Sequence, residues 1–331
     1  MKAVEAGKRI LVTGAGGFVG PHLIDELKRA CGEGANIFGT SLMGLAHPTL
    51  GWLEPLDICD AEATRGAVAR WRPTHVVNLA GLAAPASAAA APEAAWGVHL
   101  RGSRNLAEAI LAEAPDCWLL HVSSGLVYGA SAKSGQPMDE DTLLAPQDEY
   151  SASKAAGELA LGALAPRGLR CVRLRPFNHA GRGQSADFVV AAFATQIARI
   201  EAGLAPAVMR VGNLEASRDF LDVADVVAAY ALAVRDSERL VSGDIFNIAS
   251  GRAWPISAIL TRLLSLSAMT IAVEPDPARE RPDDLPMVVG DASRIRTRLG
   301  WAPRHDFMTT IGEVLDDARQ RVAADAGGGP T

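Results

Sequence analysis

The sequence predicts an α/β protein built on a doubly wound parallel sheet, with a smaller C-terminal domain that is interleaved with it in sequence. Three observations predict this class. Short apolar runs alternate with helix-like stretches through residue 177, and the first of these runs ends in a glycine-rich turn. Beyond Arg175 the alternation gives way to irregular segments interrupted by prolines. Strands that alternate with helices are typical of a parallel sheet covered on both faces.

The strands are expected where apolar residues run without interruption, because the strands of a parallel sheet are buried on both faces. In chain order these runs are 8–13, 36–40, 74–79, 117–122 and 169–174. Helices are expected between them at 18–30, 61–71, 96–114 and 151–164. Alanine favours helices, so the alanine-rich stretch 83–95 is expected to form a helix or a loop that leads into one.

The domain boundaries follow from where this pattern stops. Residues 1–177 are expected to form the first domain, and 223–249 to return to it as a helix (223–234) and a strand (245–249). Residues 178–222 and 250–322 are expected to form the second, substrate-binding domain. The small, glycine-rich end of the chain, 323–331, is expected to be a flexible tail.

The composition is that of an ordinary globular protein, with 49% hydrophobic and 21% charged residues. The net charge of −6 argues against nucleic acid and against an anionic membrane as partners. No apolar signal core and no run of 18 apolar residues occurs, so we expect a cytoplasmic protein without a membrane span. The cysteines are far apart, which favours reduced thiols and no bound metal: Cys31, Cys59, Cys117 and Cys171.

The glycine-rich turn is the first candidate binding element. Gly14, Gly17 and Gly20 follow an expected strand and open an expected helix. This context is the fingerprint of a dinucleotide-binding Rossmann sheet, because the backbone approaches the pyrophosphate closely at the positive end of the helix. The alternative is a glycine-rich turn without a ligand.

The end of the second expected strand bears on the choice of dinucleotide. An acid there binds the adenosine ribose diol in NAD-selective proteins, whereas this chain has Thr40 and Ser41. We therefore expect NADPH, with NADH as the alternative because no arginine stands there either. Asp57 is a candidate acceptor for the adenine amine, or else an ordinary surface acid after a strand.

Tyr150 and Lys154 are the candidate catalytic pair. Their spacing of four residues places them on one face of a helix, where an ammonium would lower the pKa of the phenol toward working pH. Tyr150 would then exchange a proton with a carbonyl or alcohol oxygen. Ser124, at the end of the fourth expected strand, is expected to orient that oxygen with support from Ser123, unless both are turn serines.

These motifs together resemble the extended short-chain dehydrogenase/reductase family of nucleotide-sugar enzymes, from about Arg9 to Trp301. The matching stretches are 13–20, 78–81, 123–129, 150–154, 175–179, 212–223 and 281–284. The resemblance implies a cofactor site completed by Phe18, Val19, Ile58, Leu79, Ala80, Gly81, Ser123 and Phe177, with Lys154 on the nicotinamide ribose. It implies that Asn178 and Arg218 hold the nucleotide sugar, with Arg281 on the diphosphate. It also implies a homodimer that pairs through the helices 96–114 and 151–164.

Within this family, the stretches 175–179 and 212–220 resemble the GDP-sugar branch, which contains 4-keto-6-deoxymannose reductases and dehydratases. The dehydratases carry a catalytic glutamate where this chain has Leu126, and leucine cannot remove a carbon-bound proton. We therefore expect reduction of a GDP-4-keto-6-deoxyhexose, a step of GDP-rhamnose and lipopolysaccharide biosynthesis. The alternatives are a 4-epimerase, a dehydratase with His99 or Glu140 as the base, and a non-catalytic dinucleotide sensor.

One residue departs from the family pattern. Many members have asparagine where this chain has His99, in the stretch His99-Leu-Arg-Gly-Ser103. That asparagine supports the active-site backbone or a water. His99 either substitutes for it or is a core histidine with its hydrogen bonds satisfied.

Overall fold

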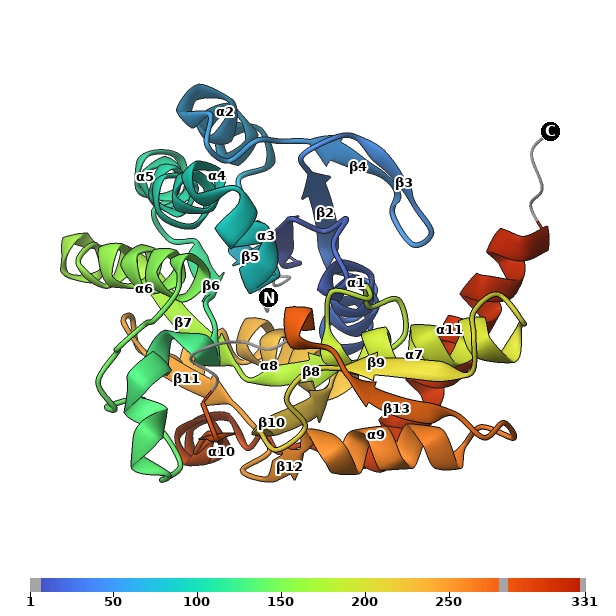
Figure 1. Cartoon of the computed structure of the whole chain (residues 1–331). Helices are drawn as coiled ribbons and strands as arrows, with labels where there is room; N and C mark the ends of the chain where they lie inside the picture. Colours follow the sequence, from blue (N-terminus) through green and yellow to red (C-terminus); the bar gives the residue numbers. More distant parts are fainter. Residues whose placement is uncertain (1–6, 280–284, 328–331) are drawn as a thin grey trace.

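The computed structural model describes residues 7–279 and 285–327. Within them, the centre of the molecule is an eight-stranded sheet with the order β11-β7-β6-β5-β1-β2-β4-β3 (Figure 1). Neighbouring strands are parallel except for β3 and β4. The strands are β1 Arg9–Thr13, β2 Asn36–Ser41, β3 Leu45–His47, β4 Gly51–Pro55, β5 His75–Asn78, β6 Trp118–Val122, β7 Arg170–Pro176 and β11 Ile245–Ile248.

The doubly wound sheet predicted from the sequence is confirmed, and β1 shows why its strands read as continuous apolar runs. Ile10 and Val12 of β1 pack into one core with the helices α1 and α8. Leu11 packs into a second core on the opposite face with α2 and α5. These helices are α1 Val19–Cys31, α2 Ala61–Trp71, α5 Ser103–Glu113 and α8 Val223–Arg235.

The stretch expected as a helix at 96–114 is helical through Glu113, but it contains one π-helical segment that was not predicted. The chain forms α3 (Pro85–Ala90) and α4 (Pro92–Trp96), then one wide π-helical segment, η1 (Gly97–Gly102), before α5 begins. The expected helix 151–164 is observed as α6, Glu149–Gly162. Single π segments often occur at functional sites, and η1 packs directly against α6.

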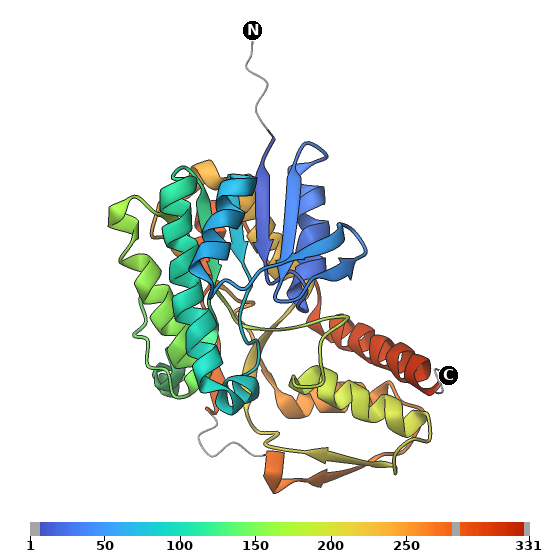
Figure 2. The same cartoon turned by 90° about the horizontal axis from the view of Figure 1, so that it is seen from above.

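The second domain has a separate core, and in Figure 2 its elements lie to one side of the large sheet. Strand β10 pairs with β8, β12 and β14, and β9 pairs with β13. Its elements are α7 Val189–Glu201, α9 Ile256–Ser265, α11 Phe307–Gly327, β8 Asn178–Ala180, β9 Val208–Val211, β10 Ser217–Asp222, β12 Ala253–Pro255, β13 Ala272–Pro275 and β14 Met287–Val288.

Two details differ from the expected boundaries of this domain. The helix α10 (Ser293–Leu299) lies within the segment 250–322, yet it packs against β11 of the large sheet. Residues 323–327 continue α11 rather than forming a tail, because their alanines favour the helix. Residues 328–331 lie outside the described part of the chain. The division into two domains otherwise stays a prediction.

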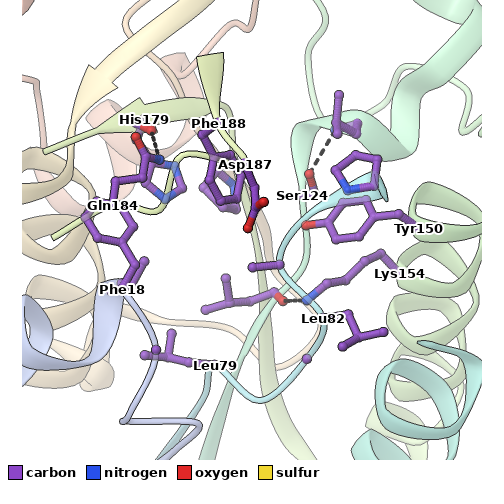
Figure 3. A pocket seen from close by; sticks show the side chains of 18 of the residues that line it. Phe18, Leu79, Leu82, Ser124, Tyr150, Lys154, His179, Gln184, Asp187 and Phe188 are labelled. Atoms are coloured by element: carbon purple, nitrogen blue, oxygen red, sulfur yellow. Dashed lines mark hydrogen bonds between the residues drawn. The ribbon is translucent and has the colours of Figure 1, made fainter. Parts of the chain in front are cut away.

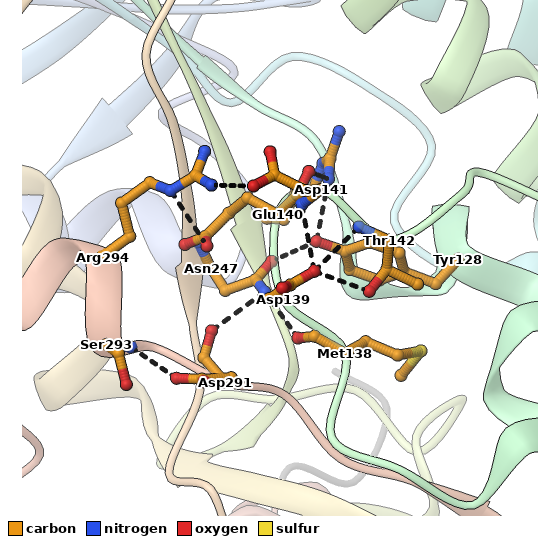
Figure 4. Close-up of polar contacts among 11 residues, drawn as sticks. Tyr128, Met138, Asp139, Glu140, Asp141, Thr142, Asn247, Asp291, Ser293 and Arg294 are labelled. Atoms are coloured by element: carbon orange, nitrogen blue, oxygen red, sulfur yellow. Dashed lines mark hydrogen bonds and ion pairs between the residues drawn. The ribbon is translucent and has the colours of Figure 1, made fainter.

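A buried polar network fastens the segment after β6 to the edge of the sheet (Figure 4). Tyr128 Oη donates to Asn247 Oδ1 at 2.7 Å, and Asn247 N donates to Glu140 Oε1 at 2.8 Å. Arg175 Nη1 donates to Tyr128 Oη at 2.8 Å, and Arg175 also forms a buried ion pair with Glu158 of α6. The network therefore fixes α6, which carries Tyr150 and Lys154, to β7 and β11.

None of the helices in the described ranges combines the length and apolarity that a membrane crossing requires. The same ranges contain no group of three or more histidine, cysteine or acidic side chains arranged to hold a metal ion. All four cysteines have free thiols.

Candidate active site

A cavity of about 1100 Å³ lies at the carboxyl ends of the central strands, between the large sheet and the second domain. In open α/β sheets, ligands bind outside the carboxyl ends of the strands. One part of the wall comes from the turn after β1, the loops after β2, β4, β5 and β6, and α6. The other part comes from the segments around β8, α7, β9 and β10.

The glycine-rich turn lies on this wall, and Gly14, Gly17, Phe18, Val19 and Gly20 all face the cavity. Gly14 has φ +69°, and a Cβ there would come within 2.6 Å of the backbone nitrogen of the neighbouring β5 loop. A Cβ on Gly17 would meet nothing closer than 3.5 Å. The turn therefore leaves an open approach to the N-terminal end of α1, where a pyrophosphate fits.

The end of β2 corrects one predicted cofactor contact. Thr40 is fully buried and does not line the cavity; its carbonyl instead accepts from Ala15 N at 2.7 Å and holds the glycine-rich turn. The next residues, Ser41, Leu42 and Met43, face the cavity. Because side chains alternate along a strand, the sequence placed the contact one residue too early.

Asp57 and Ile58, two of the predicted cofactor contacts, line the cavity farther from the glycine-rich turn. Asp57 Oδ1 accepts from Cys59 N at 2.8 Å, which fixes the carboxylate after β4. Sequence reasoning missed Arg101, which η1 brings to the same cavity from 44 residues farther along the chain.

The loop after β5 is held by Asn78. Its Oδ1 accepts from Thr13 Oγ1 at 2.7 Å and from Ala80 N at 3.2 Å. Leu79, Ala80 and Gly81, which the resemblance assigns to the cofactor site, line the cavity beside the glycine-rich turn.

The structure brings the three predicted catalytic residues together (Figure 3). Asp148 caps the start of α6 by accepting from Ser151 N at 2.7 Å, so Tyr150 lies in the first turn of the helix and Lys154 follows one turn later. Lys154 Nζ donates to Val122 O at 3.1 Å, at the end of β6. Ser124 follows two residues on and accepts from Leu126 N at 3.1 Å through its Oγ.

The predicted effect of Lys154 on the phenol is wrong for this arrangement. Burial raises the pKa of Tyr150 to about 12, although the hydrogen bond with Ser124 lowers it in part. Burial also lowers the pKa of Lys154 to about 8. Lys154 Nζ lies 6.0 Å from the centre of the Tyr150 ring and donates to a carbonyl, so desolvation outweighs the charge. Tyr150 is consequently protonated at neutral pH and suited to donate a proton.

His99 is a buried histidine with both ring nitrogens in use. Nδ1 lies 2.8 Å from Ser153 Oγ and Nε2 lies 3.2 Å from Leu82 O. Its ring meets the Tyr150 ring edge-on, with centroids 5.6 Å apart. Burial and the charge of Lys154 lower the pKa of His99 to about 2, so it holds the Tyr150 ring in place and does not take up a proton.

The position of the dehydratase glutamate is apolar in this cavity. Leu126 lines the wall and packs against Tyr150, Ala88 and Ala95. Glu140, the other candidate base, is buried in the polar network and does not line the cavity. Ser123 and Phe177, two further predicted cofactor contacts, line the cavity, and both are buried.

The second domain contributes the predicted Asn178 and Arg218 to the wall. Arg218 Nη1 donates to Ser217 O at 2.8 Å and to Leu285 O at 2.7 Å, which orients the guanidinium. Arg281 lies outside the described residues. Several lining residues were missed because nothing in the local sequence marks them: Gln184, Asp187, Phe188, Arg210, Asn213 and Arg279.

Known proteins with similar sequences and structures were compared with this chain. Residues 10–249 match the family described as "NAD dependent epimerase/dehydratase family". The chain is 33% identical to GDP-6-deoxy-D-mannose reductase of Pseudomonas aeruginosa, over 95% of this chain and 98% of that protein. It is 29% identical to UDP-glucose 4-epimerase of Azospirillum brasilense, over 92% and 90%. The structure of RMD from Pseudomonas aeruginosa complexed with NADPH superposes with a TM-score of 0.82, at 30% identity, over 95% of this chain and 99% of that one.

Proposed function

The chain belongs to the NAD dependent epimerase/dehydratase family, and on that premise we propose that it reduces the 4-keto group of a GDP-4-keto-6-deoxyhexose with NADPH. The product is GDP-6-deoxy-D-mannose, also called GDP-D-rhamnose. The observation that carries this proposal is a pair of hydroxyls, Ser124 and Tyr150, facing the cavity beside an apolar Leu126. That set can protonate an oxygen, and Leu126 cannot remove a proton from carbon.

The cavity fits a dinucleotide next to a second ligand. Gly17 leaves its approach open and Ser41, Asp57 and Ala80 lie along the same wall. A bound dihydronicotinamide supplies the hydride that adds to C4 of the sugar. NADPH is the cofactor we propose, with NADH as the alternative, because the end of β2 carries no acid that would repel a 2′-phosphate.

Proton transfer is the step that the chain itself performs. The Ser124 hydroxyl orients the carbonyl oxygen, and the protonated Tyr150 donates its proton to the same oxygen as negative charge develops on it. The Lys154 ammonium is buried in the same region and donates to Val122 O, and we assign it to the nicotinamide ribose, as the resemblance implies. Burial excludes water from this region and strengthens each of these interactions.

The nucleotide end of the substrate is assigned to the second domain. Arg218 and Asn178 line the cavity there, together with Arg210 and Arg279. Guanidinium groups match the oxygens of a diphosphate, so several arginines on one wall support a nucleoside diphosphate as the carrier. Arg281 is proposed to join them.

A 4-epimerase is the second candidate, because a hydroxyl pair that protonates an alkoxide also serves the reverse step. It is favoured by the likeness to the UDP-glucose 4-epimerase and by the same Ser124, Tyr150 and Lys154. The two functions differ in stoichiometry. A reductase consumes one NADPH per keto sugar, whereas an epimerase interconverts two nucleotide hexoses without net loss of reduced cofactor.

The experiment that tests the proposal incubates the purified protein with GDP-mannose alone and with GDP-4-keto-6-deoxymannose plus NADPH. We expect no dehydration of GDP-mannose and stoichiometric loss of NADPH with the keto sugar. Dehydration of GDP-mannose without any added dehydratase would move the chain to the dehydratase branch. We also propose that the protein is a cytoplasmic homodimer that supplies GDP-D-rhamnose for lipopolysaccharide.

A further inference from the structure

The cavity contains one acid among the cations of its second-domain wall. Among the described residues, this wall carries the three arginines Arg210, Arg218 and Arg279 and a single acid, Asp187. A carboxylate placed against a diphosphate would weaken its binding by like-charge repulsion. Asp187 must therefore meet another part of the ligand.

Asp187 ends the loop between β8 and α7 and points away from that loop into the cavity. In Figure 3 it lies with Phe188 on the wall opposite Ser124 and Tyr150. Ser185 Oγ donates to Asp187 Oδ2 at 2.9 Å, which holds the carboxylate in place. Among residues 7–279 and 285–327, no lysine, arginine or histidine forms an ion pair with it.

Asp187 is exposed to solvent and also lines the main cavity. Its carboxylate does not cap α7, because that helix begins after Phe188 and has no side-chain cap. The carboxylate is therefore open to a ligand in the cavity and can accept hydrogen bonds from a group that donates them.

We infer that Asp187 accepts hydrogen bonds from the hydroxyl groups of the hexose and thereby selects a neutral, hydroxyl-bearing sugar over a hexuronate. A guanine base would also donate to a carboxylate, through its N1 and N2 hydrogens. The base and the reacting C4 lie at opposite ends of a nucleotide sugar, with the diphosphate between them. Asp187 shares the end of the cavity that holds Ser124 and Tyr150, which assigns it to the sugar.

This inference rests on the proposed function for its kinetic test. The comparison uses Asp187→Ala and Asp187→Asn, with Asp316→Ala as the matched control. Asp316 is an exposed acid on α11 of the same domain, outside the cavity, paired with Arg319 at 2.9 Å. Each of the alanine variants removes one carboxylate from the second domain.

With GDP-4-keto-6-deoxymannose and NADPH, we expect Asp187→Ala to lower kcat/KM about 10- to 100-fold, the scale of a hydrogen bond to a charged group. Asp187→Asn keeps a neutral acceptor and should fall between Asp187→Ala and the unchanged Asp316→Ala. Inhibition by GDP alone should stay within twofold in all variants. A kcat/KM within twofold of the parent for Asp187→Ala would overturn the inference, and a parallel loss of GDP inhibition would reassign Asp187 to the base.

A binding experiment separates this inference from the proposed function. Competition against a fluorescent GDP probe should show that the parent binds a GDP-linked hexose at least about tenfold more tightly than a GDP-linked hexuronate, because two carboxylates would face each other. Asp187→Asn should narrow that ratio to about threefold or less. An unchanged ratio overturns the inference even if the protein turns out to be no reductase. A further outcome would also overturn the inference. If the parent exchanged the C5 hydrogen of the sugar with D₂O and Asp187→Asn did not, Asp187 would be a base.

Discussion

Two effects shift the pKa of the Tyr150 hydroxyl in opposite directions. Burial raises the pKa of Tyr150 to about 12, and the hydrogen bond with Ser124 lowers it. The ring is fixed by His99 on one edge and by Leu126 on another. A phenol of this kind keeps its proton until charge develops on a nearby oxygen, which suits the direction of reduction.

Tyr150→Phe should leave cofactor binding nearly intact and lower kcat by at least about 10²-fold, the usual scale for a general acid. The substitution keeps the ring against His99 and Leu126 and removes the hydroxyl alone. Steady-state turnover and NADPH titration by fluorescence measure the two effects separately. Turnover within a few-fold of the parent would rule out Tyr150 as the proton donor.

The lowered pKa of Lys154 leads us to expect that cofactor binding depends on pH. Burial lowers the pKa of Lys154 to about 8, so its ammonium is present below that pH and is lost as the pH rises through it. NADPH affinity should therefore weaken between about pH 7 and 9.5. Lys154→Met should bind NADPH weakly and without this dependence, and an identical pH profile in the two proteins would contradict the assignment.

Some residues of the candidate site could be predicted from the sequence and others could not. Ser124, Tyr150 and Lys154 could be predicted because each has a hydroxyl or ammonium at a fixed spacing from a strand end or along a helix. Thr40 was misplaced by one position, since its backbone and not its side chain serves the glycine-rich turn. Asp187 could not be predicted, because only the folded loop brings it opposite Tyr150.

At the scale of elements, the contact between η1 and α6 builds the active site. Gly157 of α6 lies under the carbonyl of His99, and a Cβ at Gly157 would sit 2.2 Å from that oxygen. The close approach lets His99 reach both Ser153 and Leu82. The wide π segment thus depends on a glycine about 55 residues away in sequence.

Gly157→Ala should destabilise the protein by about 1–3 kcal/mol, the range for forcing atoms into a packed contact. Gly66→Ala is the matched control, because Gly66 lies in the interior of α2 and a Cβ there meets nothing within 4 Å. That change should stabilise by about 0.5–1 kcal/mol through helix propensity. Urea unfolding followed by circular dichroism measures both, and equal midpoints for the two variants would refute the close contact.

The elements of the large sheet could be predicted from their uninterrupted apolar runs, and α2 was predicted to the residue. The π-helical segment within 96–114, which packs against α6, could not be predicted, because nothing in the local pattern marks it. The hairpin β3–β4 and the short strands of the second domain were also missed. The two strands of the hairpin contain few buried residues. Many prolines lie around the short strands of the second domain, which hides their pattern.

At the scale of the molecule, two separate cores meet at one cavity. The sheet side holds the groups proposed to bind the dinucleotide and transfer the proton, and the second domain holds the arginines and Asp187. The sequence pattern predicted two interleaved domains, because the regular alternation of strands and helices stops after residue 177 and returns at 223–249. The resemblance then assigned Arg218 and Arg281 to the second domain.

The proposed homodimer makes a prediction about the outer face of α6. Leu159 lies on that helix with 58% of its surface exposed, which is a large value for a leucine on a helix of this sheet. In a dimer that pairs through α5 and α6, Leu159→Glu should place a charge in an apolar interface and shift the protein to monomer. Sedimentation of the parent at micromolar concentration should give the dimer mass, and a monomer alone would refute the pairing.

We expect hydride to reach C4 of a GDP-linked keto sugar while Tyr150 protonates its oxygen. The most direct measurement uses NADPH deuterated at the transferring position, GDP-4-keto-6-deoxymannose and the purified protein, with the product read by NMR. We predict one deuterium at C4 of GDP-6-deoxymannose for each NADPH consumed, and none with Tyr150→Phe over the same time. Unlabelled product, deuterium at any other carbon, or recovery of the keto sugar with NADPH intact would contradict the account.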